Sequence, residues 1–257
     1  MGNEHLTYPR ENVRYLQWYE GHFSAVFVAF HPFFVLPGVR PDECDWGTFI
    51  VDNRGAIDAP TLDDLEDLRA AERDGLIAAT DIEALIPSRA RPMSWIDTCR
   101  NAGMRSHQHL NQALRTHIRG LKRKFEDRPA ADRLEQFSAE KGVFLPTEGE
   151  FQVLHREGLA SLARQLGVSQ VVASDDVTEE VRVIEVSHLT RPWEWWPKRL
   201  WTPDESMLAV VDSDSFFTLI CLSDAAMRTI DMPPFEGFWA DATTEHDWWL
   251  HPLPGTA

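Results

Sequence analysis

The stretch MLAVVDSDSFFTLIC, residues 207–221, decides the fold that this sequence predicts. Two apolar runs rich in β-forming residues flank the polar segment DSDS, a pattern typical of a β-hairpin. A second apolar run, residues 23–30, ends before His31 and Pro32, because proline cannot donate to a strand ladder. That N-terminal strand needs a partner, and we expect the C-terminal hairpin to supply it.

Helical patterns fill the region between these strands. The longest predicted helix covers residues 94–122, with Ser94 as its N-cap and Asp97 completing a capping box. Thr147 and Glu150 predict the start of another helix, which Gly167 ends. Other expected helices cover residues 12–20, a segment from Thr61, 81–86, 128–140 and 223–230, and other expected strands cover residues 46–51, 170–173, 181–188 and 236–240.

These patterns predict an α+β fold with a mixed or antiparallel sheet. N-terminal and C-terminal strands form the sheet, and a central helical region packs on it. The length of 257 residues fits a single domain covering residues 1–257. A change of composition near residues 167–180 is the candidate boundary within it.

The charge of the chain restricts its partners. Asp and Glu number 41 against 25 Lys and Arg, which gives a formal charge of −16. Such a field repels phosphate backbones, so we expect no nucleic acid as a partner. The longest apolar stretch, residues 23–36, is too short to span a bilayer, so we expect no membrane association. The acidity favours either simple colloidal stability or the electrostatic attraction of a basic protein partner.

The three cysteines indicate the compartment. Their odd number and wide spacing argue against a disulfide framework and against a cysteine zinc site. The first residues show no signal-peptide pattern. We therefore expect a cytoplasmic protein.

Motifs for nucleophilic catalysis and phosphate binding are missing from the sequence. The candidate polar cluster consists instead of scattered histidines and carboxylates. Histidine and carboxylate side chains are ligands for borderline metals, so the tail could form half a metal site that His188 completes. The alternative is a tail anchored by its tryptophans, and we predict no defined metal site and no particular cofactor. The members of this cluster are His31, His188, Glu245, His246, Asp247 and His251.

An aromatic strap, residues 190–205, has the sequence TRPWEWWPKRLWTPDE. Its prolines exclude it from a central strand. Tryptophans at this density favour either a binding surface or a clamp that is buried against the sheet. The candidate binding residues are Trp193, Trp195, Trp196, Lys198, Arg199 and Trp201.

The first functional hypothesis is an interaction module that combines this strap with an acidic surface. It resembles in principle a bacterial immunity protein, which neutralises a basic toxin by covering it. The alternative is a small-molecule hydrolase, with or without a metal ion, that uses histidine and carboxylate residues. A third hypothesis is a carbohydrate-binding module, which the intracellular cysteine usage disfavours.

Two segments resemble a family of uncharacterised bacterial proteins of similar size. They are DSFFTLICLSDAAMRTIDMPPFEGFWADATTEHDWW, residues 214–249, and VFVAFHPFF, residues 26–34. The resemblance rests on hydrophobic and tryptophan positions and concerns a domain of unknown function. It implies a bacterial cytosolic setting and supplies no activity, so no functional residue is carried over.

Overall fold

The computed structural model describes residues 4–10, 13–47, 75–175, 180–193 and 195–245. It confirms the α+β class. One sheet has seven strands in the order β10-β1-β9-β8-β7-β5-β6, and a second has three in the order β3-β2-β4. All strand pairings described in the two sheets are antiparallel.

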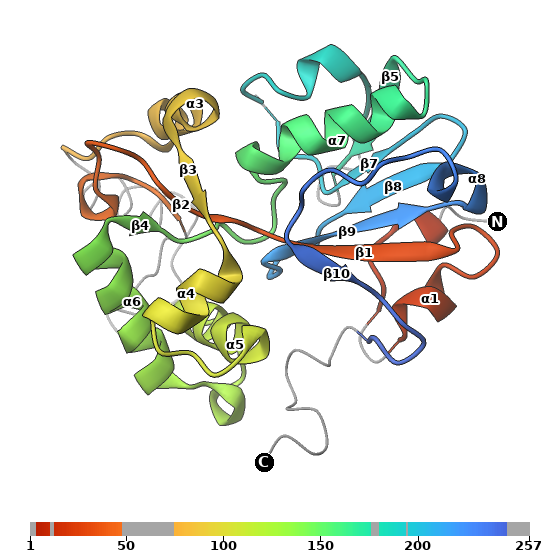
Figure 1. Ribbon diagram of the computed structural model, residues 1–257. Helices are drawn as coiled ribbons and strands as arrows, with labels where there is room; N and C mark the ends of the chain where they lie inside the picture. The colour runs from red at the N-terminus through yellow and green to blue at the C-terminus, as the bar shows by residue number, and fades with distance from the viewer. Residues whose placement is uncertain (1–3, 11–12, 48–74, 176–179, 194, 246–257) are drawn as a thin grey trace, which may run out of the picture.

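The elements follow one another along the chain as labelled in Figure 1. The strands are β1 Ala25–Phe30, β2 Phe33–Val35, β3 Arg91–Met93, β4 Val143–Phe144, β5 Gln170–Ser174, β6 Val181–Glu185, β7 Arg199–Trp201, β8 Met207–Val210, β9 Phe217–Leu222 and β10 Gly237–Trp239. The α-helices are α1 Tyr15–Trp18, α3 Ala79–Arg89, α4 Trp95–Asn101, α5 His107–His117, α6 Arg128–Lys141, α7 Val153–Gln165 and α8 Asp224–Met227. Short 3-10 helices are η1 Glu4–Leu6, η2 Pro41–Glu43, η3 Arg123–Phe125 and η4 Val186–His188.

The predicted hairpin and its N-terminal partner are confirmed. Strand β1 lies between β9 and β10 and pairs with both. Side chains alternate along a strand, so Val26 and Val28 enter one core cluster while Phe27 and Ala29 enter another. Because both faces of β1 are covered, its sequence is apolar throughout.

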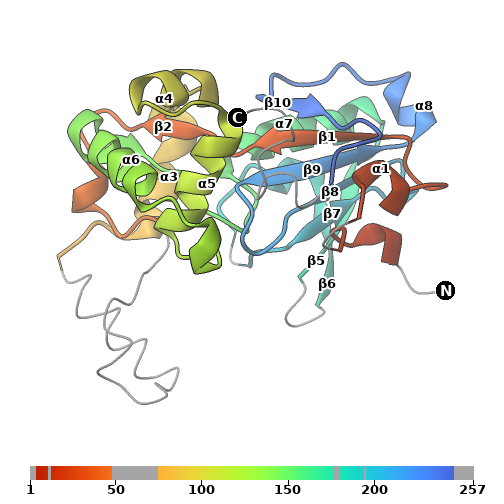
Figure 2. The same ribbon diagram turned by 90° about the horizontal axis from the view of Figure 1, so that it is seen from below.

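Helices cover the two faces of the large sheet differently (Figures 1 and 2). Helix α7 packs on one face, where Leu159 and Leu162 belong to the same cluster as Leu200 of β7. On the other face, the cluster that contains Val28 also contains Trp95 of α4 and other side chains of α5 and α6. One hydrophobic core therefore continues from the sheet into the helical part of the molecule.

The small sheet belongs to what we call the helical half, made of β2, β3, β4 and α3 to α6. Strand β2 starts only two residues after β1, with His31 and Pro32 between them. Phe34 of β2 stacks on Phe144 of β4 with ring centroids 4.8 Å apart, and Ile82 of α3 packs against them. This short connection holds the two sheets next to each other.

The prediction of one long helix over residues 94–122 is wrong. Helix α4 ends at Asn101 and α5 starts at His107. Gly103 adopts a φ of +67°, which glycine tolerates at a helix end. Ser106 then accepts a hydrogen bond from the backbone of His109 and caps the second helix. The apolar stripe continues across the break, which is why periodicity alone predicted one helix.

Two further helix boundaries differ from the prediction. Helix α3 continues through Pro87 to Arg89, although proline cannot donate the hydrogen bond to the Glu83 carbonyl that a helix would form here. The predicted capping residue Thr147 does not start α7, which begins at Val153. Thr147 instead accepts a hydrogen bond of 2.6 Å from the side chain of Gln152, the residue at the N-cap of α7.

Some predictions concern residues outside the described part of the chain. They are the helix from Thr61 and most of the strand over residues 46–51. Among the described helices, none has both the length and the apolar composition needed to cross a bilayer.

Substitution of Gly103 by Ala distinguishes the broken helix from a continuous one. In a continuous helix, this change raises the free energy of unfolding by up to about 1 kcal/mol. In the observed structure it forces a left-handed alanine, so we expect a decrease of about 1–2 kcal/mol. No atom lies within 4 Å of the added Cβ, so packing does not obscure the result. Urea unfolding of the wild type and the variant measures this difference. A variant that is more stable than the wild type would contradict the break between α4 and α5.

Candidate functional site

A cleft of about 770 Å³ lies where the helical half meets the large sheet. Helix α7 forms one wall, residues 92–94 at the end of β3 form another, and the segment before β10 closes it. Its volume falls within the range of small-molecule sites. The lining is largely apolar, with Phe30, Pro32, Pro92, Met93, Leu154, Met232, Pro233, Pro234 and Phe235 among its residues.

A glycine on α7 shapes this wall. A Cβ at Gly158 would meet the ring of Phe235 closer than van der Waals contact allows. The absence of a side chain lets the Phe235 ring lie directly against the helix. Glycine weakens a helix interior relative to alanine, so the close approach of Phe235 explains why α7 accepts it.

Glu236 connects the segment before β10 to the helical half. Its carboxylate accepts hydrogen bonds from the backbone N–H groups of Trp95 at 2.6 Å and Ile96 at 3.2 Å. These groups lie at the N-terminus of α4, where the helix dipole favours negative charge. The backbone carbonyl of the same Glu236 accepts from Phe30 at 2.8 Å. The walls of the cleft are therefore held together by residue 236.

Two buried histidines lie next to each other, one of them in the wall of the cleft. His31 and His155 have ring centroids 5.9 Å apart. His31 Nδ1 lies 3.1 Å from the Thr147 carbonyl oxygen, so Nδ1 carries the proton and Nε2 accepts from the Thr218 hydroxyl at 3.1 Å. Both ring nitrogens of His31 are therefore used inside the protein. The predicted site residue is present at the junction, but as a buried structural group.

His155 lines the cleft itself and packs edge-on against Phe235. Burial lowers the pKa of His155 to about 4, against the raising effect of its hydrogen bond with the backbone of Phe30. Burial, together with the proximity of His155, also holds the pKa of His31 well below its usual value. Both imidazoles are therefore neutral at pH 7, which adds no positive charge to the cleft.

A buried arginine lies beside the cleft on α7. Arg156 pairs with Glu83 of α3 at 3.5 Å, and this contact joins α7 to the helical half. Its guanidinium carbon lies 4.3 Å from the ring centroid of Trp193, which is a cation–π contact. Burial lowers the pKa of Arg156, while Glu83 raises it. The charged pair explains how a nearly inaccessible arginine is tolerated.

The strap is mostly packed against the protein. The indole N–H of Trp193 donates to the Leu189 carbonyl at 3.1 Å, and that of Trp195 donates to the Asp175 carboxylate at 2.9 Å. Trp201 is half-buried against the core. Trp196 is 50% exposed.

The two cationic residues of the strap point back to the backbone. Lys198 donates to the Gly149 carbonyl, and Arg199 donates to the Asp175 carbonyl at 3.5 Å. The strap therefore acts mainly as a clamp in the described structure, and Trp196 is the tryptophan it presents to solvent.

The remaining members of the predicted polar cluster are separated. His188 is exposed on η4, and Glu245 forms a bridge with Arg14, with 3.8 Å between their charged atoms. His31 lies in the core. His246, Asp247 and His251 lie outside the described residues. Within the described part of the chain, His31, His188 and Glu245 do not form a group with metal-ligand spacing.

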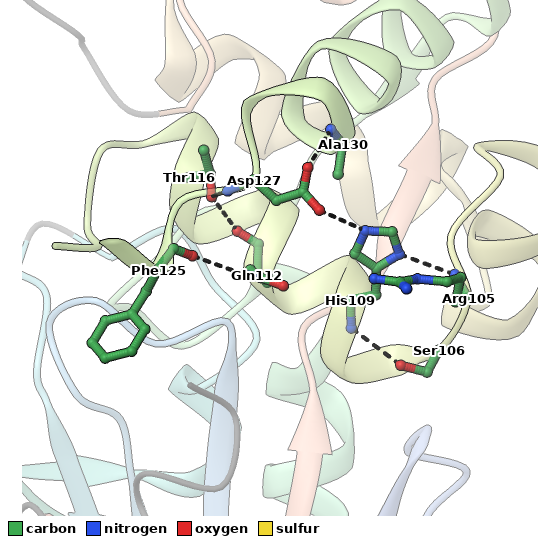
Figure 3. A network of polar contacts seen from close by, with 8 residues as sticks. All are labelled: Arg105, Ser106, His109, Gln112, Thr116, Phe125, Asp127 and Ala130. Atoms are coloured by element: carbon green, nitrogen blue, oxygen red, sulfur yellow. Dashed lines mark hydrogen bonds and ion pairs between the residues drawn. The ribbon is translucent and has the colours of Figure 1, made fainter. Parts of the chain in front are cut away.

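Figure 3 shows a second polar network, between α5 and α6. His109 accepts from the Arg105 N–H at its Nδ1 atom, 3.1 Å away, so its Nε2 carries the proton and donates to Asp127 at 3.1 Å. Asp127 also accepts from the Ala130 N–H at 3.0 Å and caps α6. His109 is buried. With both nitrogens engaged, His109 has a structural role.

A family model described as "Protein of unknown function (DUF2711)" matches residues 11–250. The chain belongs to this family. The matched residues include the whole cleft and both buried histidines, His31 and His155. No curated protein and no solved structure matches the chain significantly.

The sequence patterns did not predict the cleft of this DUF2711 protein. One sequence pattern does indicate its buried histidine: His155 lies four residues from Phe151 and four from Leu159, at the spacing of an apolar helix face. A polar residue at such a position indicates a buried, hydrogen-bonded group. No local sequence pattern could indicate the role of Glu236, because its partner Trp95 is 141 residues away.

Substitution of His155 by Phe tests the neutral buried imidazole. As the pH falls from 6.5 to about 4, the unfolded chain gains a proton at residue 155 that the folded chain excludes. The wild-type protein therefore loses stability over this range, and the variant should lose about 3 kcal/mol less, at about 1.36 kcal/mol per pH unit. Urea unfolding between pH 4 and 7.5 measures this slope.

The matched control is His188→Phe at the exposed histidine of η4. It should leave the pH dependence of the free energy of unfolding unchanged. An unchanged slope in His155→Phe would show that the buried histidine takes up its proton without unfolding.

Proposed function

We propose that this DUF2711 protein binds a small, largely apolar molecule with a cationic group in the cleft between α7 and the helical half. The observation that carries the proposal is a cleft of about 770 Å³ that combines an apolar lining with carboxylates. Among the lining residues in the described part of the chain there is no Lys or Arg. Its histidine is neutral, because burial lowers the pKa of His155 to about 4.

Asp231 is the anchor for the cationic group. The other two carboxylates of the lining are engaged, since Glu157 pairs with Arg164 at 2.9 Å and Glu236 binds the N-terminus of α4. Asp231 is held by its backbone, which exchanges two hydrogen bonds with the side chain of Gln165. Its carboxylate makes no hydrogen bond or ion pair with another described residue, so it can bind a ligand.

The overall charge of −16 supports the same preference, because it attracts cations and repels anions. The small-molecule hydrolase predicted from the sequence is the enzymatic form of this proposal, with Asp231 as the carboxylate available to activate water. A bacterial cytoplasmic setting is part of the proposal, and the three buried, unpaired cysteines support a reducing compartment.

A second candidate function is an interaction module for a basic protein, docked at strand β6. This strand is the free end of the seven-stranded sheet (Figure 2). Val181 and Val183 point to the same face and are 60% and 63% exposed. An edge strand with apolar side chains is a template for a partner protein, and the acidic charge of the chain is complementary to a basic one.

Ligand binding in the cleft is tested with amines, alcohols and carboxylates built on the same phenylalkyl and naphthylalkyl skeletons. We expect the amines to raise the melting temperature of the protein and the carboxylates to leave it unchanged. Ser161→Phe fills the cleft from α7 and should abolish the shift, whereas Ser187→Phe, at an exposed serine of η4, should retain it. Asp231→Asn should remove the preference for amines over alcohols. Shifts that survive Ser161→Phe, or equal binding of carboxylates, contradict the proposal.

Docking at β6 is tested on a complex reconstituted from the purified chain and a purified basic partner recovered from the source cells. We expect the dissociation constant to rise at least tenfold between 50 and 500 mM salt, because charge attraction is screened. The double variant Val181→Lys/Val183→Lys should abolish binding. Met227→Lys, on α8 at the surface, adds the same kind of charge elsewhere and should retain most of it. A complex that tolerates the double variant excludes β6 as the docking site.

A further inference from the structure

Three segments meet at one point, two from near the N-terminus and one from a loop distant in the sequence. They are the 3-10 helix η1, the turn before β1 and the loop between β7 and β8. They bring together His5, His22 and Glu205, whose ligand atoms all lie within 4.8 Å of one another. His5 Nε2 lies 2.9 Å from a carboxylate oxygen of Glu205, and the rings of His5 and His22 stack with centroids 3.7 Å apart.

The backbone around His5 is held in place by contacts with the core. Leu6, next to His5, is buried. The carbonyl of Thr7 accepts hydrogen bonds from the Trp18 indole at 3.2 Å and from the Tyr19 hydroxyl at 3.0 Å. The backbone N–H of His22 in turn donates to the Tyr19 carbonyl at 3.0 Å. Both histidines are therefore positioned by the same tyrosine.

The third residue of this group, Glu205, has an unusual backbone conformation. Glu205 has a φ of +54°, a conformation in which glycine or asparagine is normally preferred. Its N–H donates to the carbonyl of buried Thr202 at 2.8 Å, which fixes the turn. A non-glycine residue at a left-handed position points to a use for its side chain, and here the carboxylate faces His5.

We propose that His5, His22 and Glu205 bind one zinc ion. Two imidazole nitrogens and one carboxylate oxygen form a ligand set that suits Zn²⁺ and not Mg²⁺ or Ca²⁺, which prefer oxygen ligands. His5 and Glu205 have side chains 17% and 43% exposed, and His22 is exposed, so the ion has a path from solvent and a fourth position for water.

The geometry requires a small adjustment on binding. Ligands about 2.1 Å from a tetrahedral zinc ion lie about 3.4 Å from one another, compared with up to 4.8 Å here. Rotation of the exposed His22 side chain away from the stack supplies this movement without disturbing the core. The bound ion ties η1 to a loop 200 residues away in the sequence.

None of these residues lines the cleft, so the zinc proposal is independent of the proposed ligand binding. Residues 246–251 contain further potential ligands, His246, Asp247 and His251, which a test must separate from this site.

The test uses the full chain without a histidine tag, stripped with a chelator and dialysed. Titration with ZnCl₂ at pH 7.5, followed by calorimetry and by metal analysis after gel filtration, should give one zinc ion per chain. The melting temperature should rise with zinc and stay unchanged with MgCl₂, because an ion that binds only the folded chain stabilises it. His22→Ala, His5→Ala and Glu205→Gln should each weaken zinc binding at least tenfold.

Matched controls are His188→Ala, at an exposed histidine of η4, Glu140→Gln, at an exposed carboxylate of α6, and the double variant His246→Ala/His251→Ala in the tail. All three should bind zinc like the wild type. His22 is exposed, so His22→Ala keeps the fold and decides the result if His5→Ala fails to fold. Zinc binding that persists in His22→Ala, that is lost in the tail variant, or that is absent from the wild type at 100 µM zinc would overturn the proposal.

Discussion

The junction around His31 is the interaction on which the rest of the structure depends. Its backbone N–H donates to the Phe216 carbonyl, and its own carbonyl accepts from the Trp95 indole at 2.7 Å. Its ring joins the carbonyl of Thr147 to the hydroxyl of Thr218. Three segments distant in sequence, around Trp95, Thr147 and residues 216–218, therefore meet at one fully buried residue. Since an unpaired polar group at this depth costs about 1–3 kcal/mol, the contacts favour a single arrangement of the two halves.

The cleft is a consequence of this junction. His31 fixes where the chain leaves β1 and enters β2, so its neighbours Phe30 and Pro32 become part of the cleft lining. Glu236 closes the opposite side by bonding both to Phe30 and to the N-terminus of α4. Because hydrogen bonds hold the walls on both sides, the cleft is preformed, and a ligand that enters it has little ordering cost to overcome.

Local sequence patterns predicted much of this fold but little of the cleft. The hairpin of β8 and β9, the buried strand β1 and the cap at Ser94 were all correct, because each depends on neighbouring residues. The break between α4 and α5 was missed, since the apolar stripe continues across it. The cleft depends on contacts such as that of Glu236 with Trp95, which no local pattern contains.

The strap illustrates the same limit in another way. The prolines predicted that the strap contains no central strand, and this prediction is wrong for Arg199–Trp201. These residues lie between Pro197 and Pro203 and form β7, which pairs with both β5 and β8. Composition also could not decide which tryptophan faces are covered. The answer depends on Arg156 and Arg182, from α7 and β6, which lie over the rings of Trp193 and Trp195. Cation–π contacts and indole hydrogen bonds together remove most of the strap from solvent. The aromatic density that suggested a binding surface therefore serves first to attach β5, β6 and α7 to one another.

The cleft residues all lie within the residues that match the DUF2711 family, whereas the proposed zinc ligand His5 precedes that match. The proposed ligand binding therefore uses only residues within the family match, while the proposed zinc site also needs a residue that lies outside it.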